Sequence, residues 1–322
     1  MRRLGCLGMV LALVLLVTLF GVARSWTGAG PAEKDLAVVV PNGATLSRAA
    51  TELEKAGAIR SASRFLLFAR VLGSDAPIRA GEYRVPAQAS QSDVLELLQS
   101  GKVIQRRVTV PEGMPSVLVH EALMRAPHLT GTVAVPEEGS VLPDTYDYQR
   151  GDTRQAVLDR MQAAMRDYLA AAWKRRKPTA VVRSPREALT LASIVEKETA
   201  KAAERRAVAA VYSNRLRQGM PLQADPTVIY PVTKGRPLGR RILRSELDAK
   251  NGYNTYASAG LPVGPIANPG RASIDAVLDP AATSALYFVA DGTGGHVFAD
   301  TLEQHNANVR KWYAIRRARG EM

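Results

Sequence analysis

Two glutamates near residue 200 have the spacing that first indicates chemistry in this chain. Glu198 follows Leu191, Ile194 and Val195 by seven, four and three residues, so a helix would carry its carboxylate on an apolar stripe facing the core. Burial there disfavours the charged form and raises the pKa of a carboxyl group, as a general acid at neutral pH requires. Glu196 lies about 200° away around the helix, where solvent or a basic partner is expected.

A structural interpretation of Glu198 stays open on spacing alone. At the end of a helix, its side chain would reach water or bond Arg205 or Arg206. A lone carboxylate on an apolar face is costly unless it is paired or protonated. Spacing therefore makes Glu198 a candidate acid without deciding its role.

The helix that positions both glutamates has a well-defined start. Ser184 is a capping residue, Pro185 suits the first helical position, and Glu187 comes three residues after the cap. We expect this helix to run to about Thr199 and a second helix to follow over residues 203–218.

Several sequence strings lie around and beyond these glutamates. In chain order they are LASIVEKET from residue 191, MPLQADPTVIY from 220, YNTY from 253, GLPVGPIANPG from 260 and YFVADGTGGHVF from 287. Together they resemble the MltG/YceG-like endolytic murein transglycosylases. The likeness covers the whole chain in layout and about the last 180 residues in motif detail, from the segment at Glu138 to His305.

The resemblance implies a membrane-anchored enzyme with a LysM-like N-terminal module and a C-terminal domain that cleaves glycan strands internally. The family's catalytic glutamate falls on the second Glu of the Glu-Lys-Glu string, which is Glu198. Spacing and resemblance thus indicate the same residue, and a supporting role in substrate binding stays open for Glu196. The family's setting implies peptidoglycan glycan strands as substrate and penicillin-binding-protein synthases as neighbours, with a role in terminating new strands.

The implied reaction is non-hydrolytic cleavage of the β-1,4 bond between N-acetylmuramic acid and N-acetylglucosamine. One carboxyl group first protonates the glycosidic oxygen and then takes the proton from the C6 hydroxyl, which closes a 1,6-anhydro ring. Because the nucleophile belongs to the sugar, no second carboxylate is required to activate water.

Amide, hydroxyl and aromatic side chains in the same strings suit the hydroxyl and acetamido groups of sugars. The candidate substrate-binding residues are Gln223, Asp225, Thr227, Tyr230, Asn254, Thr255, Tyr256 and His296. Each also has a structural interpretation, since Asn, Asp and Gly with Pro form turns and a loop histidine is often satisfied by backbone groups. Asp144 and Tyr146 belong to the family's pattern as well, and we expect them at the junction between modules.

Two other functions compete with the transglycosylase. One is a non-catalytic anchor that binds peptidoglycan through residues 36–100 and recruits cell-wall synthases. The other is a hydrolase of the same bond, which would need a second carboxylate, with Asp225 or Asp291 as options. An anhydro end on the product marks the lyase, and a reducing end marks the hydrolase.

The start of the chain predicts export. The run from Leu4 to Ala23 has no charged residue and is close to the ~20 residues that a membrane-spanning helix needs, with Arg2 and Arg3 before it. We therefore expect an anchor over residues 1–25 in the inner membrane, with the N-terminus in the cytoplasm and the catalytic body outside. A cleaved signal peptide is the competing interpretation, because Gly21 and Ala23 resemble a cleavage site.

The composition argues against two classes of ligand. A net charge of +13 would suit nucleic acid, but an exported body makes that partner unexpected. An anionic lipid surface or an acidic cell-wall polymer could bind the same basic residues. Four histidines lack metal-ligand spacing and no phosphate-binding loop occurs, so no metal and no cofactor are expected.

The expected architecture is an α+β fold in consecutive parts: the anchor, a linker over residues 26–34, a LysM-like module over 35–102 and a catalytic transglycosylase domain over 103–322. Short antiparallel strands with packed helices are expected in both folded parts. Strands are predicted at 37–40, 81–85, 103–111 and 285–290, the last of them buried, and further helices at 45–55, 61–72, 90–99, 116–124, 153–173, 273–278 and 302–319.

Overall fold

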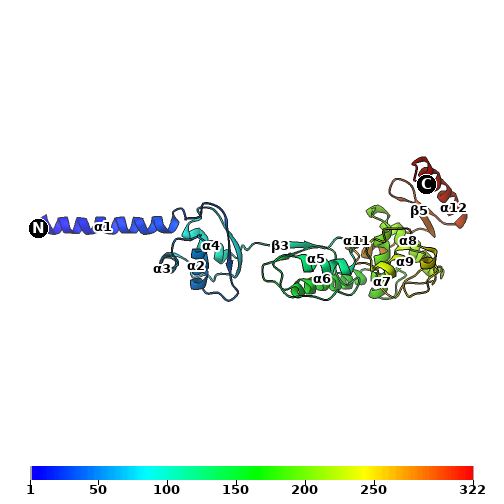
Figure 1. The fold of residues 1–322 in the computed structure, drawn as a ribbon, viewed down its shortest axis with the longest axis horizontal. Helices are drawn as coiled ribbons and strands as arrows, with labels where there is room; N and C mark the ends of the chain where they lie inside the picture. Colours follow the sequence, from blue (N-terminus) through cyan, green and yellow to red (C-terminus); the bar gives the residue numbers. More distant parts are fainter. Residues whose placement is uncertain (1, 322) are drawn as a thin grey trace. The chain divides into compact units, whose positions relative to one another are not determined.

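The computed structural model describes the backbone of residues 2–321 and the side chains of residues 9–321. The chain forms two compact units. The N-terminal unit comprises Met1–Arg106 and Tyr148–Gly151, and the C-terminal unit comprises Arg107–Asp147 and Asp152–Met322. Figure 1 shows the order of the helices and strands along the chain.

The chain begins with helix α1 (Arg2–Thr27), whose segment Met9–Thr27 is long and apolar enough to span a membrane, with a mean hydropathy of 2.0. Length and composition of this kind fit a membrane anchor or a signal sequence. Trp26, at its end, is buried against Phe65 and Phe68, with ring centroids 6.2 and 6.4 Å apart. The helix therefore continues into the start of the predicted linker, and its last turn belongs to the core of the N-terminal unit.

The rest of the N-terminal unit follows the pattern that the sequence predicts. It contains β1 (Leu36–Val40), α2 (Leu46–Lys55), α3 (Ala62–Leu72), β2 (Gly81–Val85) and α4 (Gln91–Ser100). β1 and β2 pair antiparallel, with Val38 opposite Tyr83. Thr45, Ser61 and Ser90 cap the three helices with their side chains, as residues of these types do at helix starts.

The C-terminal unit is mainly helical. Its elements are β3 (Arg106–Thr109), α5 (Ser116–Arg125), β4 (Thr145–Tyr148), α6 (Arg154–Lys174), α7 (Pro185–Glu198), α8 (Arg205–Arg217), α9 (Asp225–Thr233), α10 (Arg244–Leu247), α11 (Arg271–Leu278), β5 (Tyr287–Ala290), β6 (His296–Ala299) and α12 (Leu302–Ala318). β3 pairs with β4, and β5 pairs antiparallel with β6. The prediction of a mixed fold with short antiparallel strands is confirmed.

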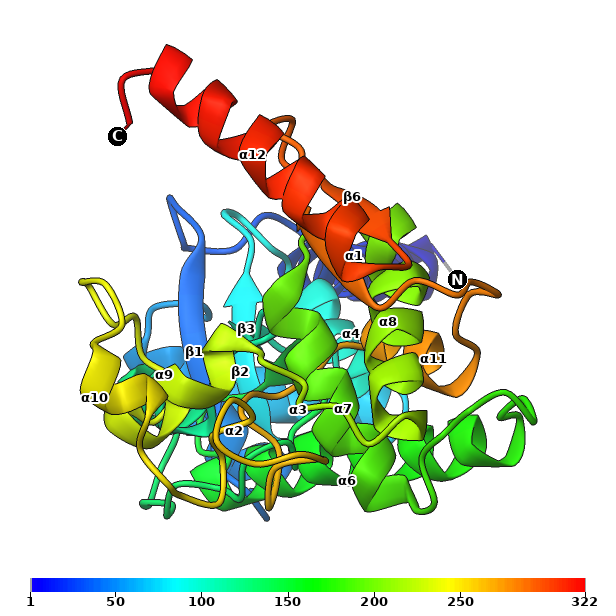
Figure 2. The same cartoon turned by 90° about the vertical axis from the view of Figure 1, so that its right-hand side faces the viewer.

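Helix α7 is the central element of this unit. Ser184 caps it by accepting a hydrogen bond from the backbone N–H of Glu187, and Pro185 opens its first turn, as predicted. Leu191, Ile194 and Val195 are completely buried, and α7 packs against α8, which lies beside it, and against α11 (Figure 2). Glu198 therefore stands at the end of a helix whose apolar face is buried.

The structure differs from the sequence predictions at several elements of the C-terminal unit. Residues 225–233 form α9, although Pro226 and Pro231 favoured a turn-rich segment; Pro226 sits in the first turn, where a missing N–H costs nothing. Strand β3 is shorter than predicted, and β4 and β6 were not predicted. The strand predicted as buried is β5, whose residues are all partly exposed because α12 and β6 cover only part of it.

Candidate active site

A pocket of about 320 Å³ opens at the C-terminal end of α7. Its walls come from α7, α8, the segment before α9, the loop at Tyr256, strand β5 and helix α12. The residues that line it are Glu198, Tyr212, Arg215, Leu222, Gln223, Asp225, Tyr256, Phe288 and His305. Four of the predicted site residues, Glu198, Gln223, Asp225 and Tyr256, are thus brought together.

The Glu198 carboxyl group is the buried acid of this pocket. Its Oε1 atom is buried and has no hydrogen-bond partner among the described residues. The pKa of Glu198 is raised to about 7, mainly by burial and also by the negative charge of Asp225, whereas the Tyr212 hydroxyl and the Arg215 guanidinium oppose the rise. A substantial fraction of Glu198 is therefore protonated at neutral pH, as general acid catalysis requires.

Helix α8 contributes two polar side chains beside Glu198. Burial and the neighbouring Glu198 carboxylate raise the pKa of Tyr212, so its hydroxyl keeps its proton and can act as a donor. Arg215 is buried and donates to three backbone carbonyls, those of Leu286 at 2.7 Å, Pro221 at 3.2 Å and Leu222 at 2.9 Å. Arg215 thus ties strand β5 and the segment before α9 to α8.

Asp225 is the second carboxylate of the pocket. It stands at the start of α9, where the helix dipole favours a negative charge. Its Oδ1 atom accepts a 2.6 Å hydrogen bond from the Tyr256 hydroxyl, and burial together with this carboxylate raises the pKa of Tyr256. The pair Asp225–Tyr256 therefore places a carboxylate in the same pocket as Glu198, whose pKa is raised.

Gln223 lines the pocket in an uncommon backbone conformation. Its φ angle is +53°, its N–H donates to the Thr255 carbonyl at 3.1 Å, and its Oε1 accepts from Arg215 at 3.2 Å. A non-glycine residue with positive φ is uncommon and often marks a functional segment. Gln223 lines the pocket, and an amide side chain there suits a sugar hydroxyl or acetamido group.

Three other predicted sugar-binding residues are buried and hold the pocket loop. Thr227 and Thr255 share a 2.8 Å hydrogen bond, and Thr255 accepts from the backbone of Ala224. The Asn254 amide donates to three carbonyls between residues 246 and 249. All three are at most 2% exposed, so they support the pocket wall rather than line the pocket.

Tyr230 and Glu196 lie in other environments. Tyr230 lines a separate groove between α5 and α9 and packs against Tyr253, with ring centroids 4.8 Å apart. The Glu196 carboxylate is 5% exposed, lies 3.6 Å from the Arg205 guanidinium and accepts a 2.9 Å hydrogen bond from the N–H of Gly270. The expectation of a basic partner for Glu196 is confirmed, and that of a solvent-facing side chain is wrong.

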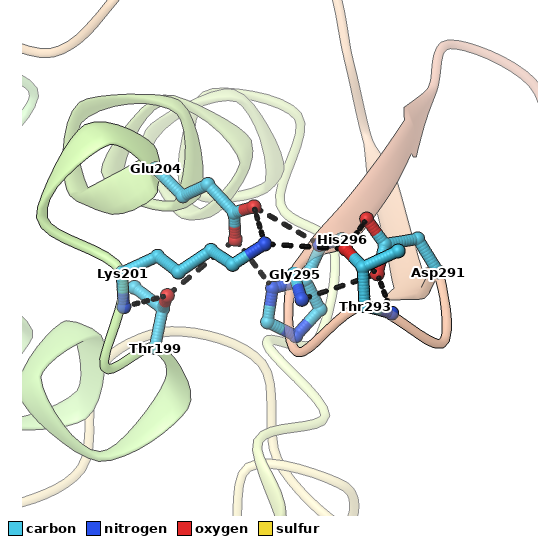
Figure 3. A network of polar contacts seen from close by, with 7 residues as sticks. All are labelled: Thr199, Lys201, Glu204, Asp291, Thr293, Gly295 and His296. Atoms are coloured by element: carbon cyan, nitrogen blue, oxygen red, sulfur yellow. Dashed lines mark hydrogen bonds and ion pairs between the residues drawn. The ribbon is translucent and has the colours of Figure 1, made fainter.

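His296 is paired with Glu204 outside the pocket lining. Its Nδ1 atom lies 2.8 Å from Oε2 of Glu204, and Asp291, on the same hairpin, accepts from the N–H groups of Thr293 and Gly295 (Figure 3). Neither His296 nor Asp291 lines the Glu198 pocket. Asp144 and Tyr146 also have structural partners: Arg271 pairs with Asp144 at 2.9 Å, and the Tyr146 hydroxyl donates to the Leu142 carbonyl.

The sequence did not single out the other residues of the pocket. Tyr212 and Phe288 read as ordinary core residues, and their rings meet at 5.8 Å in an edge-to-face contact. His305 stacks on Tyr287 at 5.2 Å, and burial together with the Arg215 charge lowers the pKa of His305. These side chains reach Glu198 because of their positions within α8 and β5 and because α12 packs on β5. Phe288 did fall in one of the family-like strings and His305 at the end of the likeness, which was the available signal.

No group of three or more His, Cys, Asp or Glu side chains within the described part of the chain could hold a metal ion. The pocket contains one protonated carboxyl group, one carboxylate that accepts a hydrogen bond from a tyrosine, and hydrogen-bond donors from Arg215, Tyr212 and Gln223. Such a site can donate a proton to a leaving group and stabilise positive charge that develops beside it.

Comparison with known proteins places this chain in a defined family. The profile of the YceG-like family matches residues 38–311, which is most of the chain. The chain belongs to the YceG-like family. It is 29% identical to the endolytic murein transglycosylase of Bacillus subtilis, over 88% of this chain and 87% of that protein.

Two further comparisons agree. The chain is 28% identical to the endolytic murein transglycosylase of Streptococcus pneumoniae, over 86% of this chain but only 58% of that longer protein. The crystal structure of a YceG-like protein from Listeria monocytogenes matches with a TM-score of 0.52 and 26% identity, over 85% of this chain and 98% of that structure. These comparisons cover both units of the chain.

Proposed function

We propose that this chain is a lytic murein transglycosylase that cleaves peptidoglycan strands internally, with Glu198 as its single acid and base. Its enzyme class follows from the YceG-like family and from relatives named endolytic murein transglycosylase. The observation that carries the assignment of Glu198 is its buried carboxyl group, with a pKa of about 7, in a pocket lined by polar side chains.

The bond we propose is the β-1,4 bond between N-acetylmuramic acid and N-acetylglucosamine. Protonated Glu198 gives its proton to the glycosidic oxygen, and positive charge develops at C1 of the muramic acid as the bond breaks. The Asp225 carboxylate, held by Tyr256, stabilises that charge. Ionised Glu198 then takes the proton from the C6 hydroxyl, whose oxygen attacks C1 and closes the 1,6-anhydro ring, so the enzyme returns to its initial protonation state.

The environment of Glu198 supports this double role. Ionised Glu198 is a stronger base in a desolvated pocket than in water, because burial favours its neutral form. The same burial limits the access of water, the competing nucleophile. Asp225 lines the pocket and is the carboxylate that a hydrolase would use, whereas Asp291 lies outside its lining.

The decisive experiment compares wild type and Glu198→Gln, both full length in detergent micelles, on purified peptidoglycan, with released ends identified by mass spectrometry. Anhydro-ended fragments from wild type and none from the variant are the expected result. Reducing ends from wild type would indicate a hydrolase acting through Asp225. Equal amounts of fragments from both proteins would show that another residue is the catalyst. No fragments from either protein would favour the non-catalytic anchor.

The same proposal covers the setting of the enzyme. Helix α1 anchors the chain in the inner membrane with its N-terminus inside and both units outside, and the N-terminal unit acts as a LysM-like module on glycan. Cleavage there terminates strands as penicillin-binding-protein synthases elongate them. Protease protection of tagged chains in spheroplasts tests the orientation: the N-terminus should be protected and the C-terminus digested.

A further inference from the structure

A polar network joins the turn after the catalytic helix to the β5–β6 hairpin. Glu204 lies in the short turn between α7 and α8, and His296 opens β6 (Figure 3). Oε1 of Glu204 accepts from the His296 N–H at 3.1 Å, and Oε2 lies 2.8 Å from Nδ1 of the same residue. Burial opposes ionisation of Glu204, but the contacts with His296 outweigh it and lower the pKa of Glu204, so its carboxylate is the acceptor for the two nitrogens of His296 that face it.

The same carboxylate also reaches the end of the catalytic helix. The Thr199 hydroxyl, one residue after Glu198, donates to Oε2 of Glu204 at 3.5 Å, and Thr199 itself caps α7. Lys201 adds a second link to the hairpin, because its ammonium donates to the Thr293 hydroxyl at 3.3 Å. One partly buried carboxylate therefore binds the residue that follows Glu198 and the first residue of β6.

Gly295 permits this close approach. A Cβ atom at this position would lie 2.3 Å from Oε1 of Glu204 and 2.4 Å from the Lys201 ammonium, nearer than such atoms approach. The hairpin thus meets the turn without a side chain between them at Gly295. A larger residue there would displace the Glu204 carboxylate and the Lys201 ammonium, and so would disturb the contacts of Glu204 with His296.

The hairpin and the helix that follows it form one wall of the Glu198 pocket. Phe288 of β5 lines the pocket, and its ring contacts the His296 ring at 5.2 Å and the Tyr212 ring at 5.8 Å. His305 of α12 also lines the pocket, and α12 packs on β5 and β6. Moving the hairpin would therefore move both side chains away from Glu198.

We propose that Glu204 and His296 are positioning residues that hold the Phe288 and His305 wall against the end of the catalytic helix and so shield the Glu198 carboxyl group from water. This inference rests on the proposed function of Glu198. It also gives a specific role to His296, which as a lone loop histidine suggested substrate binding.

If the hairpin moved away from the turn, the pH dependence of the rate would change as well as the rate itself. The ionisable groups that face Glu198 are Tyr212 and Arg215 from α8, Asp225 from α9, Tyr256 from its loop and His305 from α12. Burial is the largest cause of the raised pKa of Glu198, so entry of water moves that pKa back toward the 4.5 of an exposed carboxyl group. The alkaline limb of the rate profile would then shift to lower pH.

The test uses full-length wild type, Glu204→Gln, His296→Leu, His296→Asn and Gly295→Ala in detergent micelles with soluble uncrosslinked glycan strands. Asn places an amide N–H near the position of Nδ1 and should restore the link. We expect Glu204→Gln, His296→Leu and Gly295→Ala to lower kcat about 10-fold with little change in KM, in keeping with misplacement of a catalytic site. Their alkaline limbs should shift to lower pH, and His296→Asn should resemble wild type.

Ser284→Ala is the matched control, because the Ser284 hydroxyl bonds Asp300 at 2.8 Å near the same hairpin but away from the turn. It should leave kcat and the pH profile unchanged. An unshifted alkaline limb in all three variants, or equal losses in His296→Asn and His296→Leu, overturns the positioning role. Wild type without anhydro products would overturn the proposed function instead, so the two failures are distinguishable.

Discussion

The hydroxyl of Tyr256 donates a 2.6 Å hydrogen bond to Asp225 on the wall of the pocket that also holds Glu198. Two carboxyl groups thus share one pocket in different environments. Asp225 has a hydroxyl donor and the start of a helix, whereas Oε1 of Glu198 is buried without a partner among the described residues. This difference supports the proposal that Glu198 is the acid and that Asp225 supplies a fixed negative charge.

The pH dependence of the reaction should report the Glu198 carboxyl group. Free enzyme is competent when Glu198 is protonated, so kcat/KM should fall as pH rises through about 7. The measurement is the release of anhydro ends from soluble glycan strands between pH 5 and 9. A profile that stays flat through pH 8 would contradict Glu198 as the proton donor.

Asp225→Asn should move that alkaline limb to lower pH. The Asp225 charge raises the pKa of Glu198, so its removal makes Glu198 ionise more readily. Loss of the charge that faces the developing cation should also lower kcat, by about 10- to 100-fold. Asp248→Asn, at an exposed ion pair with Arg244, is the control and should leave the profile unchanged. A limb that moves to higher pH would contradict the arrangement.

The products of Asp225→Asn distinguish a lyase from a hydrolase. A lyase that lacks this charge is slower but still leaves anhydro ends, because the C6 hydroxyl remains the nucleophile. A hydrolase that activates water through Asp225 would lose its reducing-end products altogether. Mass spectrometry of the residual products distinguishes the two.

Glu198→Gln should make the protein more stable above neutral pH. The folded-state pKa of Glu198 is about 7 against 4.5 for an exposed carboxyl group, so folding resists ionisation. The stability contributed by neutral Glu198 is complete below pH 4.5 and is lost as pH rises to about 7, a change of about 3 kcal/mol. Thermal unfolding should show the variant above wild type at pH 8 and equal to it near pH 4. Equal stability at both pH values would mean that Glu198 is not desolvated.

The local part of this site could be predicted from the sequence, since it depends on residues close together in the chain. The cap at Ser184, the apolar stripe of α7 and the position of Glu198 on that stripe are all properties of one helix. The ranges of α2, α3 and α4 could likewise be predicted, because each helix begins beside a serine or threonine whose side chain bonds a backbone N–H three residues later.

The rest of the site could not be predicted, because it depends on contacts between segments that are far apart in the sequence. His296 pairs with Glu204, 92 residues earlier, and Phe288 and His305 reach the pocket only when the hairpin folds back on α8. Thr227 and Asn254 have side chains that suit sugars, yet tertiary packing buries both as supports of a loop. A residue type alone does not distinguish a side chain that lines a pocket from one that holds its wall.

Arg215→Met should shift the alkaline limb in the direction opposite to Asp225→Asn. The Arg215 charge lowers the pKa of Glu198, so its removal raises that pKa and extends activity to higher pH. The variant also leaves the carbonyls of Leu286, Pro221 and Leu222 without their guanidinium donor, which should cost on the order of 3 kcal/mol of folding free energy.

Urea unfolding and the pH profile of the same preparation measure both effects of Arg215→Met. Arg244→Met, which removes an exposed arginine that forms one ion pair within its own helical turn, is the matched control and should change stability by less than about 1 kcal/mol. Lysine at position 215 should not restore stability, because a single ammonium cannot reproduce the planar fork that reaches three carbonyls. A limb that moves to lower pH in Arg215→Met would show that the Arg215 charge does not act on Glu198.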